Sequence, residues 1–428
     1  MLTLRALVRG RMLVLLLVAV ALVHWLMPGI VRSDGTEAGA LEMYVRSVPG
    51  SVAAAVLLTV LAAACGLFAR EREEKRLALT LVRPVNALGV ACGKWLALSL
   101  TAALALALSS LLLLSFPPSV PPLKGTLPPC RHHYAPSLPP PAVVAADLLE
   151  DYLKDPDTPE AVRKASRSAV LTLLATKEID RYDVVKPGDT MVWPFEVPGL
   201  RDAMSTGAAL ALRVRFSTQF ELRTPVAGRL TLGPYTAMVS NNTQSVIDIP
   251  LVRSAKAMTG GGVERLDLTF VNTGKTAVMI RPRRDLEVLA PADSFAWNLL
   301  RGQLEIWSLA ALLAAYGLFL SAALSRPVAV FTALVTFAVV LIAPSVIAQF
   351  PDEFNAPLSD RIGLALSRAV QSVTASVSAP SPISDLATGK AVEWLALVRT
   401  LVGNVVALPC VLLSLAAFIV RRKPLADA

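Results

Sequence analysis

Residues 95–116 read WLALSLTAALALALSSLLLLSF and contain no charged side chain. A helix needs about 20 consecutive apolar residues to cross the hydrocarbon core of a bilayer. This stretch therefore predicts a transmembrane helix, and the uncharged run continues to Leu123. The composition indicates the same class of protein, because 54% of the 428 residues are hydrophobic and only 17% are charged.

Working outward from this stretch, five more charge-free windows are long enough to span a bilayer. They are Met12–Val31, Ser47–Ala69, Ile306–Ser325, Pro327–Pro351 and Thr400–Val420. The first window is longer than the apolar core of a signal peptide, so we interpret it as a retained span. We expect an α-helical integral membrane protein with six transmembrane helices, three within residues 1–116 and three within residues 301–428.

Lysine and arginine are concentrated in one set of flanks. These residues are Arg5, Arg9, Arg11, Arg70, Arg72, Lys75, Arg76, Arg83, Lys94, Arg326, Arg421, Arg422 and Lys423. Because basic residues favour the cytoplasmic side, both termini are expected in the cytoplasm and residues 117–300 outside it. The net charge of +9 follows largely from this bias, so no nucleic-acid partner is expected.

The segment between spans three and four has its own organisation. Residues 117–141 carry ten prolines, which indicates an extended, proline-rich extracytoplasmic linker. Residues 142–300 predict an extracytoplasmic domain that begins with helices and continues with strands. Apolar residues alternate with polar ones in two runs of this part. They are Leu210, Leu212, Val214, Phe216, Phe220 and Leu222 in the first, and Leu266, Leu268 and Phe270 in the second. This period of two predicts a β-sandwich or jelly-roll-like domain inserted between spans three and four.

Residues 70–95, REREEKRLALTLVRPVNALGVACGKW, lie between the second and third spans. Gly93-Lys94 is no phosphate-binding loop, because Gly89 is too close and Trp95 replaces the Ser or Thr that would reach magnesium. Leu77 and Leu81 share an apolar helical face. The pattern predicts a short amphipathic helix over about 70–84, lying at the membrane surface. Pro84 would end that helix and Asn86 would cap the next.

This stretch resembles the membrane-spanning subunits of ABC-2-type transporters, the exporter-type ABC permeases. Its acidic-basic run, its leucines, its proline and a Gly-Lys nine residues after the proline stand at the positions used by that family. The residues are Glu71-Arg72-Glu73, Leu77, Leu79, Leu81, Pro84-Val85-Asn86 and Gly93-Lys94. The family's Gly-Thr is replaced by Lys75-Arg76. The last loop, last span and basic tail, from LATGKAVEW to FIVRRKPL, resemble the family as well.

The resemblance implies a permease subunit in a bacterial cytoplasmic (inner) membrane, with a second permease subunit in a homo- or heterodimer. ATP and magnesium would bind to a separate cytoplasmic ABC ATPase, because this chain has no Walker motif and is not expected to be an enzyme. A coupling helix would contact that ATPase through Glu71, Glu73, Leu77, Leu81, Arg83 and Pro84. Gly93 would allow close helix packing at the membrane entry, and Lys94 would extend to the lipid headgroups.

The expected function is export or extraction of a substrate through the membrane. No predicted span window contains a charged residue, which favours a lipid-like or bulky substrate. Lipopolysaccharide-extracting permeases also carry a β-jellyroll between spans three and four, and they rank second as a resemblance. The alternative function is a membrane-anchored extracytoplasmic binding or mechanotransmission protein. Residues 352–399 are expected to form a periplasmic amphipathic loop.

Cys130, His132 and His133 form the one cluster of potential metal ligands in the outer segment. Three ligands fall short of the four that close a structural zinc site. We therefore expect no metal site and retain these residues only as weak candidates.

Overall fold

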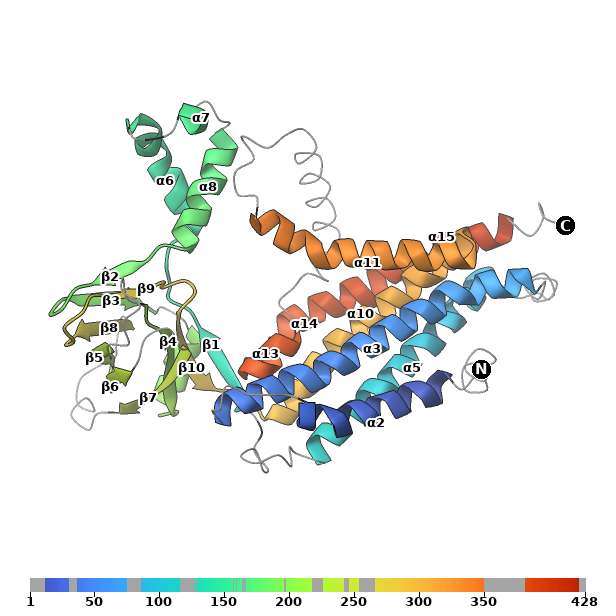
Figure 1. Ribbon diagram of the computed structural model, residues 1–428, viewed down its shortest axis with the longest axis horizontal. Coiled ribbons are helices and arrows are strands. Elements are labelled where there is room, and N and C mark those ends of the chain that lie inside the picture. The colour runs from blue at the N-terminus through green and yellow to red at the C-terminus, as the bar shows by residue number, and fades with distance from the viewer. Residues whose placement is uncertain are drawn as a thin grey trace. The chain divides into compact units, whose positions relative to one another are not determined.

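The computed structural model describes residues 12–30, 37–74, 86–115, 127–349 and 382–422, with short gaps at 128, 157, 159, 164–166, 196–197, 218–225, 242–245 and 254–265. The chain divides into two compact units (Figure 1). One is helical and combines Met1–Cys130 with the residues from Asp293 to Val346 and from Leu366 to Ala428. The other is rich in strands and contains Arg131–Ala292 together with Ile347–Ala365. Of the second segment, residues 350–365 lie outside the described residues.

Each of the six apolar windows corresponds to a helix in the helical unit. The helices are α2 (Met12–Ile30), α3 (Glu37–Glu73), α5 (Ala87–Ser115), α10 (Phe295–Ala323), α11 (Arg326–Gln349) and a last continuous helix made of α14 (Trp394–Leu401), the π-helical η2 (Val402–Ala407) and α15 (Leu408–Arg422). A short helix, α13 (Pro382–Thr388), precedes the last one. Several helices extend beyond their predicted windows, because a window ends at the first charge whereas a helix continues past it.

Among the described residues, four helical segments are long and apolar enough to cross a membrane. They are Leu41–Glu73, Ala87–Ser115, Phe295–Ala323 and Trp394–Arg422, and shorter apolar helices run over Met12–Met27 and Arg326–Val340. The chain is therefore a multi-span helical membrane protein.

Helix α10 lies at the centre of the packing in this unit. Its buried positions are mostly small, including Ala310, Ala311, Ala314 and Ala315. Small residues let membrane helices approach closely, which replaces the hydrophobic driving force that is missing between helices in lipid. A Cβ added to Gly317 would lie 2.6 Å from the Cβ of Ala64 on α3, so only glycine fits where these two helices cross.

The strand-rich unit begins and ends with strands. Its elements are β1 (Arg131–Tyr134), α6 (Pro141–Lys154), α7 (Glu160–Arg163), α8 (Arg167–Ile179), β2 (Asp183–Val185), β3 (Thr190–Pro194), α9 (Pro198–Ser205), β4 (Leu210–Arg215), β5 (Val226–Leu232), β6 (Tyr235–Asn241), β7 (Val246–Arg253), β8 (Asp267–Asn272), β9 (Val278–Ile280) and β10 (Leu286–Pro291). Helices α6 and α8 pack on each other through Ala145, Leu149, Val170 and Leu174.

Eight strands form one antiparallel sheet in the order β1-β10-β4-β7-β6-β5-β8-β3, and β2 pairs separately with β9. The sheet has two halves, one made of β1, β10 and β4 and the other of β6, β5, β8 and β3. Strand β7 joins them, because its first part pairs with β4 and its last two residues pair with β6. Inward side chains of both halves, such as Leu212 and Val288 from one and Leu230 and Phe270 from the other, belong to a single buried core. The sheet therefore curls around that core.

The predicted alternation is confirmed where it is described. Leu210, Leu212, Val214 and Phe216 are buried, as are Leu266, Leu268 and Phe270, whereas Phe220 and Leu222 lie outside the described residues. The expectation of an antiparallel β domain between the helices is confirmed, with eight of its described strands in one curled sheet and β2 and β9 in a separate pair. The linker prediction for 117–141 is wrong at Arg131–Tyr134, which pairs with β10. That tetrapeptide contains no proline, so it keeps the N–H groups that a strand needs.

Candidate functional site

The described part of the predicted coupling segment lies at one end of the helical unit. Helices α3 and α10 finish at this end and α5 begins there, and we call it the junction end. Residues 70–73 form the last turn of α3, so they do not start a separate surface helix as expected. No proline or glycine interrupts α3 between Phe68 and Glu73, which is why the helix continues into the charged run. The predicted docking residues Leu77, Leu81, Arg83 and Pro84 lie outside the described residues.

Glu71 and Lys94 form an ion pair across α3 and α5. The Nζ atom of Lys94 donates to Oε1 of Glu71 at 2.5 Å, and it lies 4.7 Å from the ring centroid of Phe68. The side chain of Lys94 is only 3% exposed, whereas that of Glu71 is 33% exposed. The expectation that Lys94 extends to the lipid headgroups is therefore wrong. A buried ammonium needs a nearby carboxylate, and Glu71 supplies it.

Arg72 links the same turn of α3 to the end of α10. Its guanidinium donates to the carbonyl oxygens of Ser321 at 2.8 Å and of Leu324 at 2.9 Å. These carbonyls lie at the C-terminus of α10, where the helix leaves acceptors unpaired and where positive charge is favourable. The Ser321 hydroxyl in turn accepts from the backbone N–H groups of Phe68 and Ala69. With a longer bond from Arg72 to the Ala322 carbonyl at 3.5 Å, five hydrogen bonds hold the end of α3 to α10 in the described residues.

Asn86 begins α5 at the junction end. Its side-chain oxygen accepts from the N–H of Leu88 at 3.2 Å, which confirms the predicted helix cap. The same oxygen accepts from Arg421 of α15 at 2.7 Å. One amide therefore connects the start of the third long helix to the end of the last one.

Glu73 and Gly93 face outward at this end. Glu73 is exposed, as a contact to another protein would require. Gly93 is exposed too, and a Cβ added there would meet no atom of the described chain within 4 Å. Among the residues that the structure describes, Gly93 therefore makes no close helix contact, and its expected packing role stays a prediction.

A second polar cluster lies at the opposite end of α10, near Phe295, and the sequence did not single it out. Asn298 is fully buried; its amide donates to the Lys390 carbonyl at 2.8 Å and accepts from the Val392 N–H at 2.8 Å. Arg301 donates to the Val392 carbonyl and to Asp293, and its guanidinium lies 4.6 Å from the Trp394 ring centroid. Asp293, Asn298 and Arg301 lie between the third and fourth predicted windows, whereas Lys390, Val392 and Trp394 lie between the fifth and sixth, so no single window pointed to this cluster.

Inside the bundle, Ser308 of α10 meets Asn404 of the last helix. The Asn404 amide donates to the Ser308 hydroxyl at 3.3 Å, and both residues are at most 1% exposed. Asn404 lies in η2, a stretch of π-helix. Single turns of π-helix occur frequently at functional sites, because they rotate side chains out of the regular helical register. Ser308–Asn404 is one of the polar contacts between helices that the charge-free windows did not predict.

The weak metal candidates do not come together. His132 and His133 are neighbours on β1, so their side chains point to opposite faces of the sheet. His133 Nδ1 lies 2.8 Å from a carboxylate oxygen of Glu287 on β10, which occupies that ring nitrogen. Cys130 is buried, and burial raises the pKa of its thiol. Within the described residues no group of three or more potential ligands could hold a metal ion.

A comparison with protein-family models finds no match, and comparisons with curated proteins and with solved structures find none either.

Proposed function

We propose that this protein is the permease subunit of an ABC-2-type exporter. Two such subunits, identical or different, would form the membrane pathway, and a separate cytoplasmic ATPase would supply the energy. The resemblance of Glu71-Arg72-Glu73 and Gly93-Lys94 to that family supports the proposal. The multi-span helical architecture is what such a subunit requires. The proposed topology places both termini and the junction end in the cytoplasm of a bacterium, at its inner membrane.

The observation that carries the proposal is the way in which the acidic run is built into the bundle. Glu71 contacts α5 through Lys94, and Arg72 contacts the end of α10. A push on the segment that follows Glu73 would therefore act on three spanning helices at once. Interfaces of this kind change between discrete arrangements rather than deforming continuously. That is the property a permease needs if closure of its ATPase is to switch access between the two membrane faces.

The proposed substrate class rests on the residues in the middle of the helical unit. The buried positions in the middle of α10 and α5 are mostly small apolar residues, together with the hydroxyl residues Ser99, Thr101, Ser109 and Ser308, and no charged residue occurs between Trp307 and Ala323. Ions crossing a membrane protein generally require charged or strongly polar residues along the path. A lipid-like or bulky amphipathic substrate, exported or extracted from the bilayer, fits this lining best.

The test is to purify the tagged protein from its host in mild detergent and to identify co-purifying chains by mass spectrometry. We expect a Walker-motif ATPase with the wild type. Glu73→Lys reverses an exposed charge and should release the ATPase, because Glu73 makes the proposed contact. Glu42→Lys applies the same reversal near the other end of α3 and should retain it.

Glu71→Gln separates docking from coupling. Glu71 is engaged with Lys94, so this variant should retain the ATPase but lose the stimulation of ATP hydrolysis by the permease. If no ATPase co-purifies under conditions that preserve other membrane complexes, the permease proposal fails. The alternative, a membrane-anchored extracytoplasmic binding or mechanotransmission protein, would then lead, with the curled sheet as its binding domain.

A further inference from the structure

Strands β6 and β7 pair at only one end. Their register joins Tyr235 to Arg253 and Thr236 to Val252, and no further pairing between them is seen in the described residues. Toward the connection between them, β7 pairs with β4 instead, through Val246–Leu251. The two strands therefore diverge, and an opening is left between them in the sheet.

Pro250 lies where the ladder between β6 and β7 stops. Continuing the register of Thr236 with Val252 places Met238 opposite Pro250. Proline has no N–H to donate to a neighbouring strand, which weakens a ladder at its position. The described pairing of β6 with β7 ends before Pro250, and the strands separate there.

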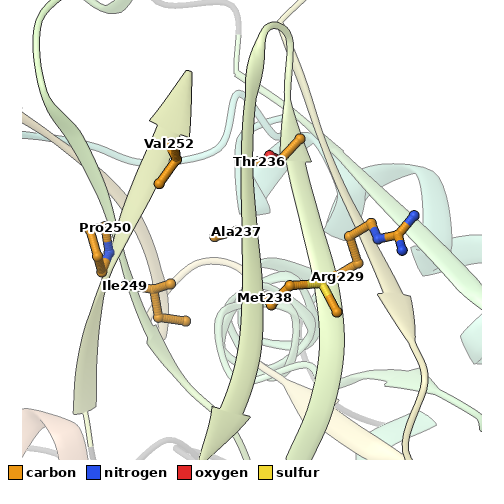
Figure 2. Close-up of a pocket in the computed structure, with 7 residues that line it drawn as sticks. All are labelled: Arg229, Thr236, Ala237, Met238, Ile249, Pro250 and Val252. Atoms are coloured by element: carbon orange, nitrogen blue, oxygen red, sulfur yellow. The ribbon is translucent and has the colours of Figure 1, made fainter. Parts of the chain in front are cut away.

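A hollow of about 520 Å³ lies at the opening, within the range of about 300–1,000 Å³ that small-molecule sites occupy. We call it the β6–β7 slot. Figure 2 shows the residues that line it, with Ile249, Pro250 and Val252 on β7 and Ala237 and Met238 on β6 across the gap. Ala237 points toward β7, whereas the Met238 side chain extends toward Arg229. Arg229 and Thr236 complete the lining.

The slot connects an exposed apolar surface to the core of the domain. Met238 is 67% exposed and Val252 is 66% exposed, which are high values for large apolar side chains. Ala237 and Ile249 belong to the core-facing sides of their strands. An apolar chain that enters between Met238 and Val252 would cover both exposed side chains and reach the core through the gap. Burying apolar surface is worth about 25 cal/mol per Å², which is the driving force for such binding.

The charges around the slot favour an acidic head group. Arg229 is the charged residue of the lining, and its side chain is exposed. Asp248, two residues before Pro250, accepts hydrogen bonds from Arg213 at 2.7 Å and from Arg131 at 2.9 Å. Its negative charge is therefore already balanced. An anion at the edge of the slot would meet positive charge rather than repulsion.

We propose that the β6–β7 slot binds a single-chain amphiphile with an acidic head group, such as a long-chain fatty acid. The chain would lie between Met238 and Val252, and the carboxylate would pair with Arg229. An added peptide strand fits less well, because Pro250 removes a donor from one edge and the paired residues Thr236 and Val252 close one end of the opening. The site lies wholly within the strand-rich unit and does not depend on transport.

The test uses the full chain in phosphatidylcholine nanodiscs and an oleic acid that carries a photoreactive diazirine in its chain. After irradiation, mass spectrometry locates the adducts. We expect them on the peptides that contain Met238 or Val252. Val252→Glu places a carboxylate beside the chain and should reduce slot labelling about tenfold, since a charge against an apolar group costs over 1 kcal/mol. Val192→Glu, at an exposed valine of β3, is the matched control and should leave slot labelling unchanged.

The head group is tested separately. Arg229→Gln should lower labelling by the acid about threefold, as expected for an exposed ion pair, and leave labelling by the methyl ester of the same probe unchanged. Equal labelling of Val252→Glu and Val192→Glu would overturn the proposal. A photoreactive amino acid in place of Met238, used in the host cell, gives an independent result. An adduct with the mass of a lipid supports the proposal, and an adduct with a polypeptide contradicts it.

Discussion

The two ends of α10 are both held by polar groups, but those groups differ in exposure. At the junction end Arg72 donates to the last carbonyls, Ser321 accepts from two N–H groups of α3, and Glu71, which pairs with Lys94, is 33% exposed. At the opposite end the fully buried Asn298 bonds to the backbone of Lys390 and Val392, and Arg301, which is 5% exposed, donates to the Val392 carbonyl and to Asp293. Water can replace a partly exposed partner, whereas breaking a buried contact leaves its groups unpaired. We therefore infer that the junction end is where α10 can move.

Glu71→Gln should have the largest effect. It leaves the buried Lys94 ammonium without its carboxylate, which we expect to cost about 3 kcal/mol. The measurement is the thermal unfolding midpoint in mild detergent. The double variant Glu71→Gln/Lys94→Met removes both charges and should regain most of the loss. If the single variant is as stable as the wild type, the ion pair does not hold the junction together.

Asn298→Leu should follow, at about 2 kcal/mol, because two buried backbone groups lose their partner. The sharper readout is hydrogen exchange. The Val392 N–H should exchange faster in this variant, while peptides of the junction end keep their wild-type protection. Faster exchange at both ends would show that the ends are coupled rather than independent.

Gly317→Ala comes next. Its Cβ would lie 2.6 Å from that of Ala64 and 3.2 Å from the Cys65 nitrogen, so α3 and α10 must separate slightly. We expect a loss of about 1 kcal/mol in unfolding free energy, read again from the thermal midpoint. Gly93→Ala is the matched control, because a Cβ there meets nothing within 4 Å. Alanine is the better helix former, so Gly93→Ala should lose no stability, and an equal loss in the two variants would contradict a role for the helix crossing.

Arg70→Gln should have the smallest effect. Arg70 pairs with Glu74 at 2.9 Å, but its side chain is 70% exposed. Exposed pairs of this type contribute about 0.5 kcal/mol or less. Arg70 is the immediate neighbour of Glu71, so the two residues occupy almost the same position along α3. The difference in thermal unfolding midpoint between Glu71→Gln and Arg70→Gln therefore measures the effect of burying the ion pair.

Much of the fold could be predicted from local patterns. The charge-free windows gave the helices, the alternation around Leu212 gave strands, and Asn86 was identified as a helix cap from its residue type and place. The prediction failed at Arg131–Tyr134, where a short proline-free run among prolines pairs with a strand far along the chain. The prediction that Lys94 extends to the lipid headgroups also failed, since nothing in the local sequence shows that α3 and α5 meet at Glu71 and Lys94.

The sequence predicted the long helices and the strands around Leu212 and Leu268, because period and hydropathy act over a few neighbouring residues. It also supplied the acidic run and the Gly-Lys that suggest a permease. Tertiary structure alone decided which polar groups meet, as with Glu71 and Lys94, or Asn298 and Val392. It also placed Pro250 at the opening of the slot, and a missing N–H matters only when another strand lies opposite. Contacts between distant segments depend on packing, and packing is a property of the whole chain.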